Sequence, residues 1–435
     1  SINPPSALMP PVSPSSYSLF NTLAAGTYDV GVGQTYTTIT AAINHYNNSC
    51  PGGPIIFRLM DTDYPNETYP VTIANPLANS GTSLTVMPNA GVAATITGSN
   101  ALALFKLSGA DYVTFNGLNT GGSSLKITNT NNASTATVFW IASAGASDGA
   151  SNNSILNCEI SGSGSNTSLG CIISCSGTSL SASADAPNSN NTISGCILKK
   201  AQNGINIIGH TGTFDQNWQI SNNEIGSTAA IDKMGNRGIL LRGVNDFDVL
   251  DNEIHGIVVN SAVAASGISI YSNASNGTIA RNRISDIVQN NSGGAAYGIY
   301  LGSTSFASNL TLQNNFISEI FSIGSATLAN NAIGINISNG GGYNIYFNSV
   351  NISTGASAAN SITAAIYISN NITASNSLDI RNNIFSNTTI PGNSYSIYSA
   401  STVSVFANIN YNDYFSGASS LLGYLQGNIS SFGAW

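Results

Sequence analysis

Hydrophobic and polar positions along the chain repeat a short pattern, in which two aliphatic residues five positions apart enclose an asparagine. In the segment LQNNFI (312–317), Leu312 and Ile317 enclose Asn315. Successive side chains of a strand point to opposite faces, so residues five apart face one core only if the chain bends between them. The pattern therefore predicts two short strands joined at a corner. Asparagine suits that corner because it tolerates left-handed backbone conformations.

This hexapeptide recurs at irregular intervals of about 30 residues, and a second apolar segment such as GISI or GIYL lies between most copies. Each unit is too small to bury its apolar face alone, so stacking of neighbouring units is expected. The units contain no crossover helix, which predicts an all-β parallel β-helix solenoid. The first aliphatic residues of the copies are Val113, Ile155, Ile193, Ile220, Val249, Ile279, Leu312, Ile345, Ile380 and Ile409.

Stacked units would align their asparagines in a ladder along the rod. Two units carry Cys158 and Cys196 at the same position. Neighbouring coils are about 4.8 Å apart, which is within disulfide range, and stacked free thiols are the alternative. The predicted ladder consists of Asn116, Asn223, Asn252, Asn282, Asn315, Asn348, Asn383 and Asn412.

The N-terminal part has a different character. Residues 1–20 are rich in proline and serine, which favours an extended arm, and we expect this arm to mediate self-association by packing on a neighbouring subunit. Residues 21–112 are predicted to form a cap and the first coils, and residues 113–435 the repeats with a C-terminal cap. One short capping helix is expected where apolar residues follow helical spacing, at Ile39, Ala42, Ile43 and Tyr46.

Composition narrows the function classes. Charged residues make up only 7% of the 435 residues, and the net charge of −8 includes no basic block. Nucleic-acid binding therefore has no electrostatic support. No apolar run has the length of a membrane span. The chain starts without methionine, and we expect a processed, exported protein with an extracellular or cell-surface location.

The chain resembles right-handed parallel β-helix proteins of the pectin-lyase-like class, and more narrowly secreted surface proteins of Bacteroidota. The resemblance begins with a GTYxVG…YxTIxxAIN…GPxxF segment that leads into the repeats. It implies the β-helix architecture, while the class includes lyases, hydrolases, adhesins and structural proteins. The matching residues are Gly26-Thr27-Tyr28, Val30-Gly31, Tyr36, Thr38-Ile39, Ala42-Ile43-Asn44, Gly53-Pro54 and Phe57.

A cluster of charged residues at 232–286 offers a candidate catalytic site, in which Asp246, Asp248 and His255 could act as acid and base. Paired carboxylates there could also bind calcium, as in enzymes that act on uronates. The plainer interpretation is a ladder of ion pairs, because Asp251 would stack on Arg281, and Glu253 on Arg283, in adjacent units. We favour the ion pairs, and expect neither a cofactor nor a metal.

Tyr300 and Tyr367 lie between core aliphatics two units apart, on one outward face. Such tyrosines can contact sugars or a partner subunit, and ordinary strand propensity also explains them. The sequence therefore favours an extracellular structural or adhesive protein, a self-assembling surface or filament subunit. The alternatives are a polysaccharide lyase or glycoside hydrolase that uses the 232–286 cluster, and a non-catalytic glycan-binding module.

Overall fold

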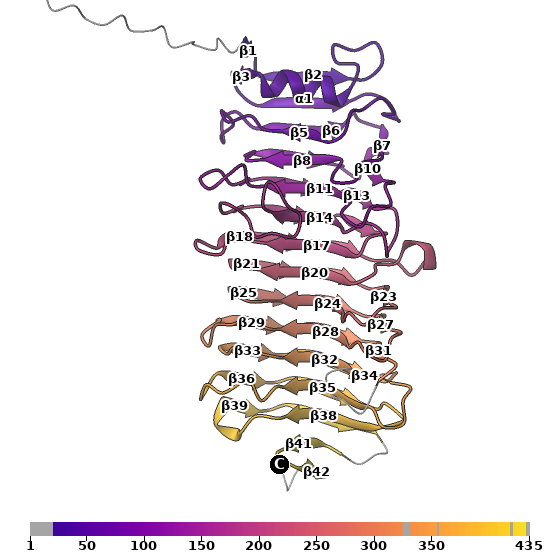
Figure 1. The fold of residues 1–435 in the computed structure, drawn as a ribbon, viewed down its shortest axis with the longest axis vertical. Helices are drawn as coiled ribbons and strands as arrows, with labels where there is room; N and C mark the ends of the chain where they lie inside the picture. Colours follow the sequence, from indigo (N-terminus) through magenta and orange to yellow (C-terminus); the bar gives the residue numbers. More distant parts are fainter. Residues whose placement is uncertain (1–20, 325–330, 355, 418–420, 432–435) are drawn as a thin grey trace, which may run out of the picture.

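The protein is a long rod of stacked coils (Figure 1). The computed structural model describes residues 21–324, 331–354, 356–417 and 421–431. The predicted arm, residues 1–20, lies outside these described residues. Within the described residues, three long sheets run along the rod, two of 13 strands and one of 11, and all their pairings are parallel except the last one, β41 with β42.

Sheet 1 contains the strand that begins each hexapeptide. Its strands are β2 (Gly26–Val30), β4 (Ile55–Leu59), β6 (Leu84–Pro88), β9 (Val113–Asn116), β12 (Ser154–Leu156), β15 (Thr192–Ser194), β18 (Asp215–Ser221), β21 (Val244–Leu250), β25 (Ser275–Ala280), β29 (Leu310–Gln313), β33 (Tyr343–Tyr346), β36 (Leu378–Arg381) and β39 (Phe406–Asn410).

Sheet 2 contains the strand that ends each hexapeptide. Its strands are β7 (Ala93–Gly98), β10 (Ser124–Asn129), β13 (Cys158–Ser161), β16 (Ile197–Lys199), β19 (Glu224–Ile225), β22 (Glu253–Ile254), β26 (Arg283–Ile284), β30 (Phe316–Ser318), β34 (Ser349–Ile352), β37 (Ile384–Asn387) and β40 (Asp413–Ser416).

Sheet 3 contains the second apolar segment of each unit. Its strands are β5 (Val71–Ile73), β8 (Phe105–Ser108), β11 (Thr137–Ala142), β14 (Gly170–Cys175), β17 (Asn203–Ile208), β20 (Arg237–Arg242), β24 (Ala265–Ile270), β28 (Ala296–Leu301), β32 (Ala332–Ile337), β35 (Ile362–Ile368), β38 (Asn393–Ser399), β41 (Gly423–Leu425) and β42 (Asn428–Ile429).

Two small sheets and two short 3-10 helices complete the described elements. A two-stranded sheet joins β1 (Asn21–Leu23) and β3 (Ser49–Pro51). A three-stranded sheet in the middle coils lies between sheets 2 and 3 along the chain. This sheet contains β23 (Ile257–Val259), β27 (Ile287–Gln289) and β31 (Ile320–Ser322), and the 3-10 helices are η1 (Ala230–Asp232) and η3 (Val403–Val405).

Each coil therefore runs from sheet 1 around a corner into sheet 2 and then into sheet 3, which confirms the predicted all-β parallel solenoid. The two aliphatic ends of the hexapeptide, such as Leu312 and Ile317, are both fully buried. The bend between them places both in one core, as their spacing required. The handedness of the winding stays a prediction.

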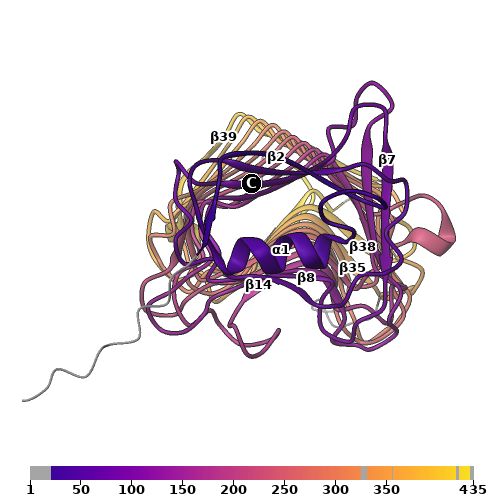
Figure 2. The ribbon, with the colours of Figure 1, turned by 90° about the horizontal axis from the view of Figure 1, so that it is seen from above.

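The predicted helix is present as α1 (Ile39–Asn47) at the N-terminal end of the rod (Figure 2). Its buried side chains are the four that the spacing selected. The carboxylate of Glu67 accepts hydrogen bonds from the first-turn N–H groups of Ile39 and Thr40, at 2.7 and 2.6 Å. At the other end, the Asn47 side-chain amide donates to Thr72 O and accepts from Ala74 N, so it satisfies backbone hydrogen-bonding groups at the edge of sheet 3.

Seven of the predicted asparagines form a continuous hydrogen-bonded ladder at the corner between sheets 1 and 2. In each step, the backbone N–H and the side-chain Nδ2 of one asparagine donate to Oδ1 of the asparagine in the next coil, at 2.9–3.1 Å. Nδ2 also donates to a strand carbonyl of the preceding coil, for example from Asn315 to Ile279 O. The buried amides therefore satisfy one another and the backbone at the bend.

Two details of the predicted ladder are wrong. The left-handed residue of the corner is the one before the ladder asparagine, such as Asn314 with φ 55°, and not the ladder residue itself. Asn116 lies outside the ladder because Phe115, not Val113, pairs with Ile155. The shift of two residues leaves Asn116 on the outer side, where its Oδ1 accepts from Leu118 N and Asn157 Nδ2.

Replacement of a central ladder amide should destabilise the rod. In Asn315→Ala, Asn282 loses the acceptor for two buried N–H groups, and Asn348 loses the side-chain donor but keeps the backbone N–H of residue 315. We expect a loss of about 3 kcal/mol in unfolding free energy, measured from urea denaturation curves. The matched control Asn351→Ala, at an exposed position, should change stability by less than about 0.5 kcal/mol. Equal effects of the two variants would contradict a stabilising ladder.

Candidate functional site

The charged cluster at 232–286 forms ion pairs between neighbouring coils. Arg281 makes a bidentate pair with Asp251, with both N–O distances 2.7 Å, and Arg283 lies 3.8 Å from Glu253. These are the two stacked pairs that the register predicted. Lys233 Nζ also lies 2.6 Å from the Asp286 carboxylate. All are at least partly exposed, so they contribute little stability and mainly balance charge along the corner.

The structure does not bring Asp246, Asp248 and His255 together. Asp246 and Asp248 lie on β21 in sheet 1, whereas His255 follows β22 in sheet 2 and pairs with Glu224 at 3.4 Å. Asp246 has φ 63° and stands in line with Asn217 and Asn276 of the adjacent coils, which have the same left-handed conformation.

Asp246 is therefore a turn residue of the kind that asparagine provides in neighbouring coils. A catalytic site made of these three side chains is not supported. In the described part of the chain, no group of three or more His, Cys, Asp or Glu side chains is placed so that it could hold a metal ion.

The predicted disulfide is absent: Cys158 and Cys196 are buried free thiols in adjacent coils. Burial raises the pKa of both, that of Cys196 to about 12, so the unreactive protonated form dominates. Each thiol instead lies against backbone carbonyl groups of the corner, Cys158 against Leu156 O and Cys196 against Ile155 O. The cysteines thus take the core position of the ladder asparagine as small apolar side chains.

A thiol titration tests this arrangement. Without reductant, unfolded protein should show five reactive thiols, and native protein should show one, Cys50, because the other four cysteines are buried. Detection of three thiols in guanidinium chloride would instead indicate a disulfide.

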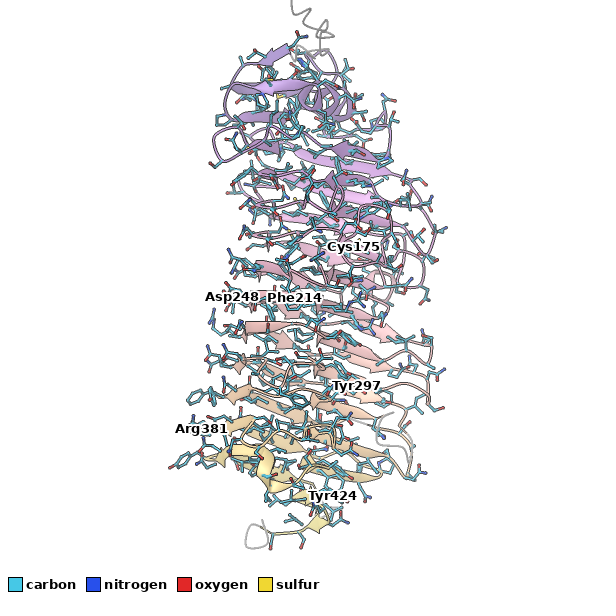
Figure 3. The ribbon with its side chains drawn as sticks, turned by 60° about the vertical axis from the view of Figure 1, so that its left-hand side comes forward. Cys175, Phe214, Asp248, Tyr297, Arg381 and Tyr424 are labelled. Atoms are coloured by element: carbon cyan, nitrogen blue, oxygen red, sulfur yellow. The ribbon has the colours of Figure 1, made fainter. Side chains whose placement is uncertain are left out.

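The outward side of sheet 3 carries a column of tyrosines that is the most distinctive surface of the described chain. Tyr300, Asn336, Tyr367, Tyr398 and Tyr424 occupy one register position in successive coils. Three further tyrosines flank this column. We call the whole set the tyrosine face: Tyr271, Tyr297, Tyr300, Asn336, Tyr367, Tyr395, Tyr398 and Tyr424. Figure 3 shows Tyr297 and Tyr424 on one side of the rod and Asp248 and Arg381 on another.

The rings of the tyrosine face contact one another along the rod. Tyr398 and Tyr424 stack with centroids 4.2 Å apart and ring planes 4° from parallel, and Tyr367 lies 5.6 Å from Tyr398. In the upper part, Tyr300 lies 5.1 Å from Tyr271 and 5.4 Å from Tyr297. Neighbouring rings therefore hold each other in place and present edges and hydroxyl groups outward, at one coil spacing of about 4.8 Å.

Tyr297 lies beside Tyr300 although the two are three residues apart, which a regular strand would not allow. Gly298 lies between them, and a Cβ there would be 2.6 Å from Gly334 O and 2.4 Å from a methyl group of Ile317. Only glycine fits this close approach, where the strand bends. Figure 2 shows the bent course of the sheet-3 strands. The bend partly shields the tyrosine face, and Asn336 is only 5% exposed.

The tyrosine face keeps unused hydrogen-bonding capacity. The Oδ1 atom of Asn336, between Tyr300 and Tyr367, is buried without a partner, as are those of Asn203 and Asn206 further up the same sheet. Burial raises the pKa of Tyr398 to about 12, so its hydroxyl group stays protonated and can donate. Tyr300 Oη donates to Ser338 Oγ at 3.1 Å. Aromatic edges, hydroxyls and amide oxygens are thus combined on one surface.

A pocket lies on the same side of the rod, nearer the N-terminus. Its volume is about 550 Å³, and its lining includes Ser108, Ser143, Thr178 and Asp185. The Gly177 N–H, 2.9 Å from Asp185 Oδ2, and two serine hydroxyls lower the pKa of this carboxyl group. The loop beyond the pocket packs Leu180 against Trp140 on the outside of sheet 3. The pocket and the tyrosine face are therefore both built on the outer surface of sheet 3.

Asp215 is a buried carboxyl group at the start of β18. Its Oδ1 accepts from Asn188 N and His210 N at 3.1 and 3.0 Å, whereas Oδ2 has no partner. Burial raises its pKa from 3.8 to about 7. Because the folded-state pKa is the higher one, this group's contribution to stability is fully present below pH 3.8 and is lost as the pH rises through about 7.

Asp215→Asn should therefore be stabilising at alkaline pH. The amide keeps the acceptor oxygen for both N–H groups and carries no charge. We expect it to raise unfolding free energy by about 4 kcal/mol at pH 8 and to change little at pH 4, measured by urea denaturation at both values. An exposed control, Asp413→Asn, should show no such difference, and a pH-independent effect of Asp215→Asn would contradict the assignment.

Most of the tyrosine face was missed in the sequence, where only Tyr300 and Tyr367 stood out. Tyr398 follows the same pattern, in YSIYS, and could have been found. Tyr297 and Tyr395 could not, because their outward direction depends on the bend.

In the described residues, no helix has the length and apolarity that a membrane crossing needs.

Comparisons with known proteins add little to this description. No protein-family model matches the chain, and no curated protein matches it. Among solved structures, the chain is similar to the GH136 lacto-N-biosidase from Eubacterium ramulus, with 9% sequence identity and a TM-score of 0.42 over 92% of this chain and 68% of that chain. This similarity is too weak to assign an activity.

Proposed function

We propose that the protein is an extracellular structural and adhesive rod that binds carbohydrate chains through the tyrosine face. The observation that carries this proposal is the continuous outward column of Tyr300, Asn336, Tyr367, Tyr398 and Tyr424. Core packing does not require these residues, since they point away from the interior of the rod. Tyrosine combines an apolar ring with a polar hydroxyl group, which matches the alternation of C–H and O–H groups on a sugar.

The geometry fits an extended chain better than a single sugar. The column repeats at the coil spacing of about 4.8 Å, which is close to the length of one pyranose unit in an extended polysaccharide. Ring stacking along the rod fixes the tyrosine hydroxyls before binding, so little side-chain entropy is lost when a ligand binds.

The low charge supports the adhesive role and the extracellular location. Only 7% of the residues are charged, and the polar exterior consists mainly of Ser, Thr and Asn. Neutral polysaccharides offer hydroxyl groups and few charges, so hydrogen bonds and apolar contacts are the interactions available to both partners. A rod with many equivalent coils can also contact one long chain at several points, which raises the overall affinity.

Binding to insoluble polysaccharides tests the proposal. Purified protein is incubated with cellulose, chitin, xylan and pectin, and the bound fraction is measured against concentration. We expect binding to at least one of them, and a loss of at least about fivefold in affinity for the double variant Tyr300→Ala/Tyr367→Ala, at about 0.5–1.5 kcal/mol for each ring.

The matched control is Tyr346→Ala, a half-exposed tyrosine of sheet 1, which should bind like the wild type. Equal binding by the double variant would contradict a role of the tyrosine face. Release of soluble sugars during the incubation would instead indicate a lyase or hydrolase.

A further inference from the structure

The outer side of the ladder corner exposes large apolar side chains in four consecutive coils. The exposed fractions are 46% for Phe316, 57% for Phe347, 49% for Ile384, 80% for Tyr411 and 58% for Phe415. Soluble proteins rarely leave such side chains together on the surface without a partner. We call these five residues the apolar corner.

The register places four of the five residues of the apolar corner along one ridge, and Phe415 one outward position further along sheet 2. Phe316 and Ile384 occupy the same position at the start of β30 and β37, two coils apart. Phe347 directly precedes the ladder residue Asn348 in the coil between these two. Tyr411 directly precedes the ladder residue Asn412 in the coil that follows Ile384. The aromatic and aliphatic groups therefore alternate between the two sides of the buried asparagine, with at least one in every coil.

The same two outward positions are polar in the three coils directly above. They hold Glu224, Glu253 and Arg283 on the sheet-2 side, and Asp251 and Arg281 on the sheet-1 side. Two of these coils are joined by the ion pairs described above. The change from charged to apolar at one structural position shows that the fold of the corner does not require the apolar residues.

Backbone conformation gives a second, independent indication. Phe347 and Tyr411 have φ values of 56°, in the left-handed region where bulky side chains are unfavourable. Most other residues at this corner position are asparagine or glycine, which adopt this conformation more easily. Arg281 is an exception, and its side chain forms an ion pair with Asp251. The left-handed corner residues are Asn157, Gly195, Asn222, Asp251, Arg281, Asn314, Phe347, Asn382 and Tyr411.

Strained residues persist where they serve another purpose. Phe347 and Tyr411 gain little from the rod itself, because more than half of each is exposed to solvent. Their presence at a position better suited to asparagine points to a contact outside the chain.

We propose that the apolar corner is an interface between two copies of this chain, packed ridge to ridge around a twofold axis. Five half-exposed side chains of this size offer about 500 Å² per copy, so a pair would bury about 1,000 Å², the size from which a specific interface is expected. A straight ridge is complementary to its own antiparallel copy, as an isologous dimer requires. An area at this lower limit corresponds to a weak dimer, with a dissociation constant in the micromolar range.

A lipid surface fits the same ridge less well. At the two outward corner positions of these four coils the one charged side chain is Asp413, and Arg381, just before the corner in sheet 1, is paired with Asp379 at 2.7 Å. A carboxylate beside Tyr411 and Phe415 is repelled by anionic head groups. It is compatible with the rim of a protein interface, which is polar and open to solvent.

Sedimentation velocity from 1 to 100 µM tests the dimer with the variant Phe347→Asn/Tyr411→Asn. Asparagine occupies this position in neighbouring coils, at Asn314 and Asn382, so the variant should fold and melt at the same or a higher temperature. We expect a concentration-dependent dimer for the wild type, and at least a tenfold rise in the dissociation constant for the variant. The matched control is Phe306→Asn, which removes a side chain that is 57% exposed outside the apolar corner and should dimerise like the wild type.

Two outcomes would overturn the proposal: a wild type that stays monomeric at 100 µM, or equal dimerisation of the wild type and the double asparagine variant. Binding of a monomeric wild type to lipid vesicles, lost in the variant, would assign the ridge to a membrane surface instead. The result does not depend on carbohydrate binding, because the tyrosine face lies on sheet 3 and keeps all its residues in this variant.

Discussion

The bend between two buried aliphatic residues five positions apart is the constraint on which the rest of the rod depends. At every coil the bend brings backbone N–H and C=O groups to the edge of the core, where a polar group without a hydrogen-bond partner would destabilise the fold. The ladder from Asn223 to Asn412 solves this by linking each corner to the next, with Oδ1 accepting two bonds and Nδ2 giving two. The same bonds fix the register between coils, so that outward side chains fall into columns.

Both surfaces that we propose for binding consist of such columns. Because the interior is occupied by the aliphatic core and the ladder, the residues that differ between coils are found on the outside. On sheet 3 the outward column becomes aromatic below Tyr271, and at the corner the outward positions change from charged to apolar at Phe316. The two surfaces lie on different sides of the rod and use different chemistry. The proposed carbohydrate binding and the proposed self-association can therefore be tested by separate mutations.

The repeat was readable from the sequence because one physical rule, the facing of side chains along a strand, determines it. The predicted register was wrong at Asn116, because Val113 was taken as the core residue although the aromatic Phe115 pairs with Ile155. Asp246 looked catalytic because its left-handed conformation is invisible in a single sequence. The pairs of Asp251 with Arg281 and Glu253 with Arg283 were predictable, since they depend only on register. The outward direction of the Tyr297 side chain was not predictable, since it depends on the bend at Gly298.

We propose that the core and the asparagine ladder hold the rod together and that the outer face of sheet 3 binds carbohydrate. A crystal structure with an oligosaccharide of the polymer that binds best tests this most directly. We predict sugar density along the tyrosine face, with a hydroxyl group within hydrogen-bonding distance of Tyr300 or Tyr367. Density confined to sheet 1 or to the turns between the sheets would contradict the account.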